Sequence, residues 1–343
     1  MKIRTFLATI LLFSIVIMAC SPDDPDFIPV PDRDRTEQQV SDNDILIEYL
    51  QTHYYNKSQL AMLANPNPSD IILKTFDGTP EEGYALLFGD ENLITRTTNF
   101  ENTDYTYFIL KLNQGGGEES PKFTDKVRVE YEGRLVTDNS LFDSAVTPAD
   151  FDLVGFGVNT GVIRAWQIIY PEFNAAASFS TGANVEYNNF GLGVMFIPSG
   201  LAYFSRQLNG IPSYSNLIFK FSLLQTQIND HDSDGIPSFL EDLNNNLNTF
   251  DEDTDEDLIV NYVDPDDDGD GVATINELER TEYTVDTNLG ETEPVLAANE
   301  FELNRTTQDG VITIITGTIV DSDANGIMDY LDENISIDYS TQS

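Results

Sequence analysis

Cysteine is almost absent from this chain of 343 residues: Cys20 is the only one, so no intramolecular disulfide can form. Histidine is nearly as rare, since only His53 and His231 occur. Neither lies in a recognisable motif, and His231 sits within an acidic stretch. A histidine-based zinc site and a histidine-based catalytic triad are therefore excluded. Trp166 is the only tryptophan, and a lone indole is either a core residue or the floor of a pocket.

Basic residues are also scarce, because 17 Lys and Arg stand against 59 Asp and Glu, which gives a net charge of −42. The imbalance is strongest from Asn229 to Ser343, where two Arg and no Lys accompany 31 acidic residues. Such a surface repels nucleic acid and anionic lipid headgroups, so we expect neither as a partner. The same surface requires counter-cations, and the spacing of its carboxylates indicates which kind.

Long hydrophobic runs are limited to one, Phe6 to Ala19, which follows Lys2 and Arg4 and stops at Cys20. It is too short for a spanning helix and predicts a signal peptide over residues 1–19. Ile17-Met18-Ala19-Cys20 resembles the lipobox of bacterial lipoproteins, which implies acylation of Cys20 and an extracytoplasmic protein anchored to the envelope, at the outer membrane. The alternative is an ordinary cleaved signal peptide with an incidental cysteine.

The next segments carry little chemistry. Residues 20–40 read as an acidic, Pro-rich tether, and residues 21–26 resemble the export signals that bring some lipoproteins to the cell surface, although such stretches also serve as plain disordered tethers. Within residues 41–103, apolar residues at helical spacing predict an amphipathic helix over Ser41–Asn56. His53 lies on it without a partner motif, so we interpret it as a packed or surface residue.

The central region predicts a curved antiparallel sheet with one short helix. Apolar residues and charges alternate over residues 126–135, which is typical of a half-buried strand with Tyr131 on its inner face. A second strand over residues 217–224 presents its Phe side inward. Between them, apolar residues from Val162 to Tyr170 follow one side of a helix that Pro171 ends. This helix lays Trp166 against the concave side of the sheet.

Six motifs in order over residues 104–226 resemble the FKBP-type peptidyl-prolyl cis-trans isomerases: "VRVEYEGRL", "FDSA", "DFDL", "GVIRAW", "IPSGLAYF" and "IPSYSNLIFKFSLL". The resemblance implies an α+β fold in which a five- or six-stranded antiparallel sheet wraps around a short helix. It also implies a proline pocket with Trp166 as its floor, an aromatic wall, a backbone N–H of Ile163 that holds a substrate carbonyl, and polar groups from Asp143 and Tyr203. The residues carried over are Tyr131, Phe142, Asp143, Phe151, Val162, Ile163, Trp166, Tyr203, Ile211 and Phe219.

The implied activity is rotation about Xaa-Pro bonds of proline-containing client proteins outside the cytoplasm, which assists their folding and needs no cofactor. Two positions depart from the family pattern, because Ala165 and Phe204 stand where most relatives have glycine. We expect Ala165 to narrow access to the pocket, and Phe204 either to close the pocket or to change which residue before proline is preferred. The alternative is a non-catalytic surface binding or adhesion lipoprotein that keeps the FKBP-like fold as a docking platform.

The acidic region, residues 227–343, contains three stretches with the calcium-loop pattern of alternating carboxylates, a glycine at position 6, a backbone carbonyl at 7 and a closing acid at 12. The glycines are Gly235, Gly271 and Gly326. The predicted Ca²⁺ ligands are Asp230, Asp232, Asp234, Ile236, Ser238 and Glu241; Asp266, Asp268, Asp270, Val272, Thr274 and Glu277; and Asp321, Asp323, Asn325, Ile327, Asp329 and Asp332.

These loops resemble thrombospondin type 3 and related bacterial calcium repeats, where bound ions hold together a segment with few apolar residues. We therefore expect structural Ca²⁺ rather than a switch. Residues 251–255 show the alternation but lack the glycine and the closing carboxylate, so we interpret them as an acidic linker, with an outer ligand lent to a neighbouring site as the open alternative. The strand-like residues 310–320 are expected to give this region a small core of its own.

Overall fold

The computed structural model describes residues 31–157, 161–182 and 185–341. The predicted signal peptide, residues 1–19, and the predicted lipidation site Cys20 lie outside these ranges. Within them, no helix combines the length and the apolar character needed to cross a bilayer. The chain from Arg35 onward forms one compact unit.

A six-stranded sheet lies at the centre of this unit, and all of its neighbouring strands are antiparallel. Its order is β4-β5-β10-β11-β6-β7, so the last long strand is inserted between two earlier ones. The mixture of this sheet with few helices confirms the α+β prediction. The strands are β4 Leu93–Phe100, β5 Thr103–Asn113, β6 Lys126–Leu135, β7 Leu141–Asp152, β10 Gly191–Ile197 and β11 Leu217–Gln227.

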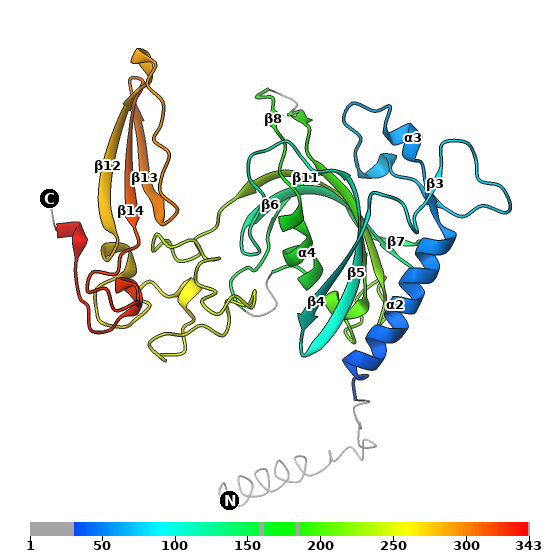
Figure 1. The fold of residues 1–343 in the computed structure, drawn as a ribbon, viewed down its shortest axis with the longest axis horizontal. Coiled ribbons are helices and arrows are strands. Elements are labelled where there is room, and N and C mark those ends of the chain that lie inside the picture. The colour runs from blue at the N-terminus through cyan, green and yellow to red at the C-terminus, as the bar shows by residue number, and fades with distance from the viewer. Residues whose placement is uncertain (1–30, 158–160, 183–184, 342–343) are drawn as a thin grey trace, which may run out of the picture. The chain divides into compact units, whose positions relative to one another are not determined.

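One face of the sheet packs against the short helix α4, Arg164–Ile169, which Figure 1 places beside the curved strands β6 and β11. Trp166 and Ile169 of α4 share a buried core with the inner residues of both strands. The helix ends where a 3₁₀ turn over Tyr170–Glu172 begins, because Pro171 lacks the N–H that would continue it. The predicted helix and its contact with the sheet are confirmed.

The opposite face of the sheet is covered by α2, Arg35–Thr52. Leu46, Tyr49 and Leu50 of α2 are buried against apolar residues of β5, β10 and β11. Both faces of β11 are therefore buried from Leu217 to Leu224. The sequence predicts burial only for the face that carries Phe219 and Phe221. The helix also begins at Arg35, inside the predicted tether, and ends before the predicted Asn56.

Residues 41–103 are thus not separate from the segment that follows. Strand β4 pairs with β5 along its whole length, across the predicted boundary at residue 103. The remaining elements outside the acidic region are small: α3 Lys57–Leu60, β1 Tyr54–Tyr55, β2 Leu73–Lys74, β3 Ala85–Leu86, β8 Ser178–Phe179 and β9 Tyr187–Asn188.

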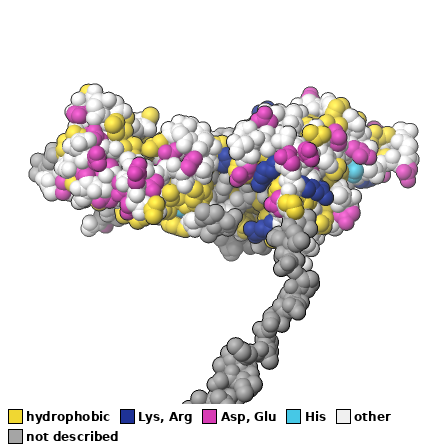
Figure 2. Space-filling model, turned by 90° about the horizontal axis from the view of Figure 1, so that it is seen from below, with side chains coloured by type: hydrophobic (Ala, Val, Ile, Leu, Met, Phe, Trp, Pro, Cys, Tyr) yellow, Lys and Arg dark blue, Asp and Glu magenta, His cyan; other side chains and the backbone are white. Residues whose placement is uncertain are grey.

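The acidic region folds into loops and a three-stranded antiparallel sheet, β12-β14-β13, with the first two predicted loops before the sheet in sequence and the third after it. Its strands are β12 Glu279–Asp286, β13 Glu300–Gln308 and β14 Val311–Thr318, the last of which falls within the predicted residues 310–320. Ile236, Leu278 and Tyr330 form a small core with neighbouring apolar residues, which joins the first and third loops to this sheet. Figure 2 shows acidic side chains spread over one face of the molecule and basic ones gathered in few places.

Candidate functional site

A cleft of about 560 Å³ opens beside α4 on the sheet face that holds Trp166. Nine of the ten residues carried over from the family pattern line it. The exception is Ile211, which lies in the core behind it and is buried. Strands β6, β7 and β11, helix α4 and the segment 202–206 all contribute lining residues, so elements far apart in the sequence build one concave surface.

Trp166 is the centre of the aromatic lining. Its ring lies 5.1 Å from Tyr131, 5.3 Å from Phe151 and 5.3 Å from Phe219, measured between centroids, with interplanar angles of 78° to 83°. Edge-to-face contacts of this kind are each worth about 0.5–1.5 kcal/mol beyond burial, so the rings hold one another in a fixed arrangement. The result is a rigid apolar floor with ring edges and faces directed at whatever enters the cleft.

Two polar groups of the cleft are fixed by hydrogen bonds. The phenolic oxygen of Tyr131 donates to Asp143 Oδ2 at 2.6 Å, and Asp143 Oδ1 accepts from the Ser144 N–H at 2.8 Å. Burial, together with the neighbouring Asp143 carboxylate, raises the pKa of Tyr131, and burial likewise raises the pKa of Tyr203. Both phenols therefore remain protonated hydrogen-bond donors at neutral pH.

A backbone donor lies at the start of α4. The N–H of Val162 donates to the Leu153 carbonyl at 3.3 Å, whereas no described residue accepts the N–H of Ile163. Ile163 is the N-cap of α4 with φ −62° and ψ 150°. Its N–H is therefore available to a carbonyl oxygen bound in the cleft.

The two departures from the family pattern do not close the cleft. Ala165 is fully buried in the core and is absent from the cleft lining. Phe204 has a left-handed φ of 49°, and its ring packs edge-to-face on Tyr214 at 5.1 Å, away from the lining. The expectation that these residues narrow or cover the pocket is wrong, because the side chain of Ala165 is directed into the core and that of Phe204 packs on Tyr214 and Arg35.

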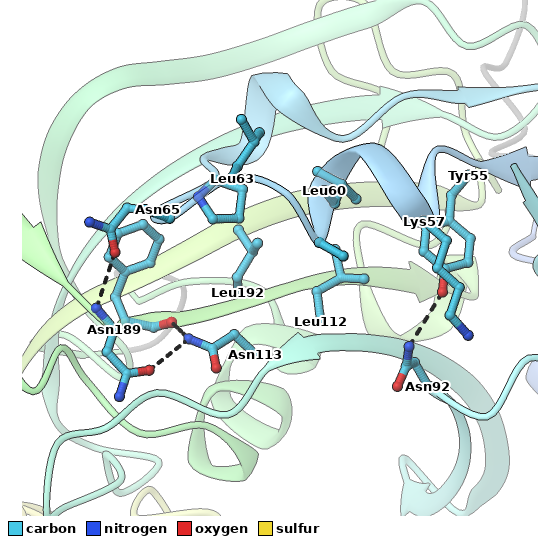
Figure 3. Close-up of a pocket in the computed structure, with 14 residues that line it drawn as sticks. Tyr55, Lys57, Leu60, Leu63, Asn65, Asn92, Leu112, Asn113, Asn189 and Leu192 are labelled. Carbon is cyan, nitrogen blue, oxygen red and sulfur yellow. Dashed lines mark hydrogen bonds between the residues drawn. The ribbon is translucent and has the colours of Figure 1, made fainter. Parts of the chain in front are cut away.

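A second cleft, of about 470 Å³, lies between α3 and strands β5 and β10 (Figure 3). Its polar groups bond one another: Asn113 Nδ2 donates to Asn189 Oδ1 at 3.0 Å, and Asn92 Nδ2 donates to Tyr55 Oη at 3.3 Å. Lys57 is engaged by Asp90 and Glu91. Since its polar groups are engaged with one another, we do not assign chemistry to this cleft.

The three predicted calcium loops share one backbone geometry. Positions 4 and 6 have left-handed φ values in each, 66° and 95° at Ser233 and Gly235, 66° and 95° at Gly269 and Gly271, and 59° and 94° at Ala324 and Gly326. Glycine is favoured at position 6, where an added Cβ would be strained. The pattern read from the sequence therefore corresponds to a recurring fold of the chain.

Each loop is closed by its ninth residue. The N–H at position 2 donates to the side chain at position 9 in all three, from His231 to Ser238, from Asp267 to Thr274 and from Ser322 to Asp329. These position-9 side chains are thus engaged within the loop, although they were predicted as metal ligands.

Two further stretches repeat the geometry and were missed. In residues 253–264, Leu258 is at position 6, and its N–H donates to Asp253 Oδ2 at position 1, as the N–H of Gly235 does to Asp230 in the first loop. Leu258 has a left-handed φ of 80°, and an acid, Asp264, is at position 12. In residues 242–253, Leu247 N–H donates likewise to Asp242. Residues 251–255, interpreted as an acidic linker, thus overlap both of these stretches, in which leucine occupies the position where the pattern has glycine.

Carboxylates of several loops converge. The oxygens of three groups lie within 4.8 Å of one another in each of four clusters: Asp230, Asp232 and Asp234; Asp234, Glu241 and Asp267; Asp253, Asp255 and Asp257; and Asp266, Asp268 and Asp270. The third predicted loop forms no such cluster among the described residues, and there Asn325 Nδ2 donates to Asp332 Oδ2 at 2.7 Å. Asp267 and Asp257 had not been singled out from the sequence.

Burial and like charge act on these acids. Burial first, then the Asp232 and Asp267 carboxylates, raises the pKa of Asp234 to about 10, and burial raises the pKa of Asp267 to about 8. Glu277 of the second loop behaves similarly, with a pKa raised to about 9. Such groups are charged at neutral pH only when a cation neutralises them.

The loops also contact the cleft region. Arg164, the first residue of α4, donates to the Leu247 carbonyl at 2.5 Å, and His231 Nε2 lies 3.1 Å from Asp152 Oδ2 at the end of β7. Tyr262 accepts from the Gly157 N–H and donates to the Gly155 carbonyl. The acidic loops are therefore packed against the segment that leads into α4.

Comparisons with known proteins give distant likenesses. A family model described as BamM C-terminal matches residues 231–313, and no curated protein matches the chain. Among solved structures, a peptidyl-prolyl cis-trans isomerase from Pseudomonas syringae pv. tomato is similar with 14% identity and a TM-score of 0.33, over 58% of this chain and 99% of that one. FkpA from Escherichia coli is similar with 25% identity and a TM-score of 0.30, over 40% of this chain and 53% of that one.

The chain thus spans about half the length of FkpA. At these TM-scores, the likenesses do not decide the activity, which has to be argued from the cleft itself.

Proposed function

We propose that the cleft around Trp166 is a peptidyl-prolyl cis-trans isomerase site of the FKBP type, in which the sheet curves around α4. The observation that carries the proposal is the convergence of nine separately spaced residues of the family pattern on one cleft with an aromatic floor. A proline ring is apolar and compact, so the edge-to-face rings around Trp166 suit it. Xaa-Pro bonds in client proteins are the substrate class.

The reaction needs no nucleophile. The barrier of about 18–20 kcal/mol arises from the partial double-bond character of the amide, which is lost when the bond twists. The twisted amide has a less polar carbonyl than the planar one, so an apolar cleft disfavours it less than the planar ground state. Catalysis then rests on preferential binding of the twisted form by the wall of Tyr131, Phe151 and Phe219.

The polar groups orient the peptide. The free N–H of Ile163 donates to a substrate carbonyl oxygen, and the phenol of Tyr203 donates to the peptide backbone. The Asp143 carboxylate, held by Tyr131 and the Ser144 N–H, presents a fixed dipole beside the twisting amide. These groups position the substrate without changing covalent bonds.

The test uses the chain without residues 1–20 and measures the cis-to-trans rate of an Xaa-Pro tetrapeptide. We expect acceleration that is lost in the Tyr131→Ala, Phe219→Ala double variant. Phe88→Ala is the matched control, because this ring is 47% exposed and lies outside the cleft lining. A folded protein that leaves the rate unchanged would overturn the isomerase proposal and favour the alternative, a non-catalytic docking surface.

We further propose that the acidic loops bind Ca²⁺ as structural ions. The support is the number of buried carboxylate oxygens without a hydrogen-bond partner, among them both oxygens of Glu241 and both of Glu277. Oxygen donors in this alternation are what Ca²⁺ takes in six- to eightfold coordination. Isothermal titration of the chelator-treated chain with CaCl₂ should give heat of binding, and the melting temperature should rise; the absence of both would contradict the proposal.

The proposed cellular location of the protein rests on the predicted signal peptide, residues 1–19. We propose that Cys20 is acylated and anchors the protein to the bacterial envelope outside the cytoplasm. Incorporation of labelled palmitate in cells that express the whole chain, and its loss in Cys20→Ser, would test this.

A further inference from the structure

Asp267 lies between two predicted ligands of the second loop, yet it belongs to a different cluster. The alternation of the loop directs Asp266, Asp268 and Asp270 toward one another, and Asp267 to the other side. The backbone N–H of Asp267 donates to Thr274 Oγ1 at 3.2 Å, and its Oδ2 accepts from the same hydroxyl at 3.1 Å. Its side chain is therefore fixed in direction, and Oδ1 is buried with no hydrogen-bond partner.

The carboxylate of Asp267 meets two acids of the first loop. Oxygens of Asp234, Glu241 and Asp267 all lie within 4.8 Å of one another, and each of the three residues is 1% exposed. Asp234 Oδ2, Asp267 Oδ1 and both oxygens of Glu241 have no hydrogen-bond partner. Among the described residues, no Lys or Arg forms an ion pair with any of them.

Three buried acids in contact are costly unless something neutralises them, because a buried unpaired charge is destabilising by several kcal/mol. Asp234 Oδ1 already accepts from the Ile236 N–H, so its free Oδ2 is the oxygen left for another partner. Asp234 also belongs to the cluster with Asp230 and Asp232. A single cation beside Asp234 is therefore within reach of acids from both sides.

We infer that Asp267 is a ligand of a divalent cation of the Ca²⁺ class bound in the first loop, so that this ion joins the first loop to the second. The inference rests on the proposed calcium binding and adds to it a residue and a role. The ion draws carboxylates from residues 230–241 and from Asp267, so the second loop is attached to the first through metal. The first loop is in turn attached to β7 through His231 and Asp152.

The experiment compares Asp267→Asn with the parent chain, both without residues 1–20. Asparagine keeps the size and the Thr274 contact but removes the charge. We expect titration with CaCl₂ to show one site weakened by about tenfold or more, equal to 1.4 kcal/mol. In chelator, the variant should melt at the same or a higher temperature than the parent, because one repelling carboxylate is gone.

Two further variants sharpen the result. Glu241→Gln should weaken the same site. The Asp267→Asn, Glu241→Gln double variant should lose no more than that one site, because the two residues bind the same ion. Asp309→Asn, on the exposed turn between β13 and β14, is the control and should bind as the parent does.

The outcomes separate the two proposals. A parent chain without Ca²⁺ binding removes the calcium proposal and this inference together. A parent that binds while Asp267→Asn binds with unchanged affinity and stoichiometry overturns only the role of Asp267. A variant that melts lower by the same amount with and without Ca²⁺ also overturns it, because Asp267 then acts in packing alone.

Discussion

The phenol of Tyr131 and the carboxylate of Asp143 are joined by a 2.6 Å hydrogen bond that links neighbouring strands β6 and β7 at the rim of the cleft. Tyr131→Phe removes the donor and keeps the ring. We expect kcat/KM for a prolyl peptide to fall about fivefold, which corresponds to the 1 kcal/mol typical of one hydrogen bond. The measurement is the isomerisation rate at several peptide concentrations.

Asp143→Leu should cost more, about tenfold, because it also removes the dipole beside the substrate amide. The losses in the double variant should be less than additive, since the two residues share one bond. Unchanged rates in both single variants, with an unchanged melting temperature, would show that this bond has no part in turnover.

Trp166 provides an optical reporter, because it is the only tryptophan and forms the floor of the cleft. A prolyl peptide seated on the indole excludes water from the cleft, so the fluorescence emission should shift toward shorter wavelength and saturate with peptide concentration. Trp166→Phe removes the signal and should weaken binding. Peptide binding that saturates without any shift of the Trp166 emission in the parent chain would place the peptide elsewhere.

The aromatic cleft could be predicted from the sequence because its residues fall in ordered motifs whose alternation also fixes their strands. Tyr131 and Phe219 lie on the inner face of strands that the pattern predicted. The covering of the other sheet face by α2 could not be predicted, because its apolar residues are few and Asp42, which is fully buried, reads as a surface acid. Asp42 accepts from the N–H and hydroxyl of Ser199, a contact distant in sequence.

The acidic loops were predicted only where glycine marks position 6. Leu258 holds that position with φ 80°, so residues 253–264 did not match the pattern. Asp267 was missed for a different reason: alternation says which way it faces within its own loop but not which loop it meets. Contacts between loops depend on tertiary packing, which a local pattern does not contain.

Phe204 contributes to stability and not to the cleft. Its left-handed φ of 49° is strained by about 1–2 kcal/mol, but its ring is 8% exposed and lies 4.2 Å from the Arg35 guanidinium. Because losing a buried Phe costs about 3–5 kcal/mol, Phe204→Gly should destabilise by about 2 kcal/mol net. Urea denaturation measures this. Phe204→Gly should leave kcat/KM unchanged at a temperature where the variant stays folded. A loss of kcat/KM there, equal to or greater than about 2 kcal/mol when expressed as a free energy, would contradict the placement of Phe204 outside the cleft.

His53 should give a pH dependence to stability. Its ring stacks on Tyr49 at 3.6 Å between centroids, and burial lowers its pKa below the ordinary 6.5. The unfolded chain therefore binds a proton near pH 6.5 that the folded chain binds only at lower pH, so stability is lost as the pH falls below 6.5. His53→Gln should lose less stability than the parent between pH 7.5 and 5.5. An identical loss in both chains would contradict this.

Leu258 offers the sharpest test of the loop geometry. Its side chain is 91% exposed, so replacing it removes almost no packing, while its φ of 80° is strained for any residue with a Cβ. Leu258→Gly should therefore raise the free energy of unfolding by about 1 kcal/mol, a gain that is rare for a change to glycine. Leu289→Gly, at a site 75% exposed within a 3₁₀ turn, is the matched control and should be neutral or destabilising. If both changes destabilise equally, the left-handed conformation at position 6 of residues 253–264 is not the one adopted in solution.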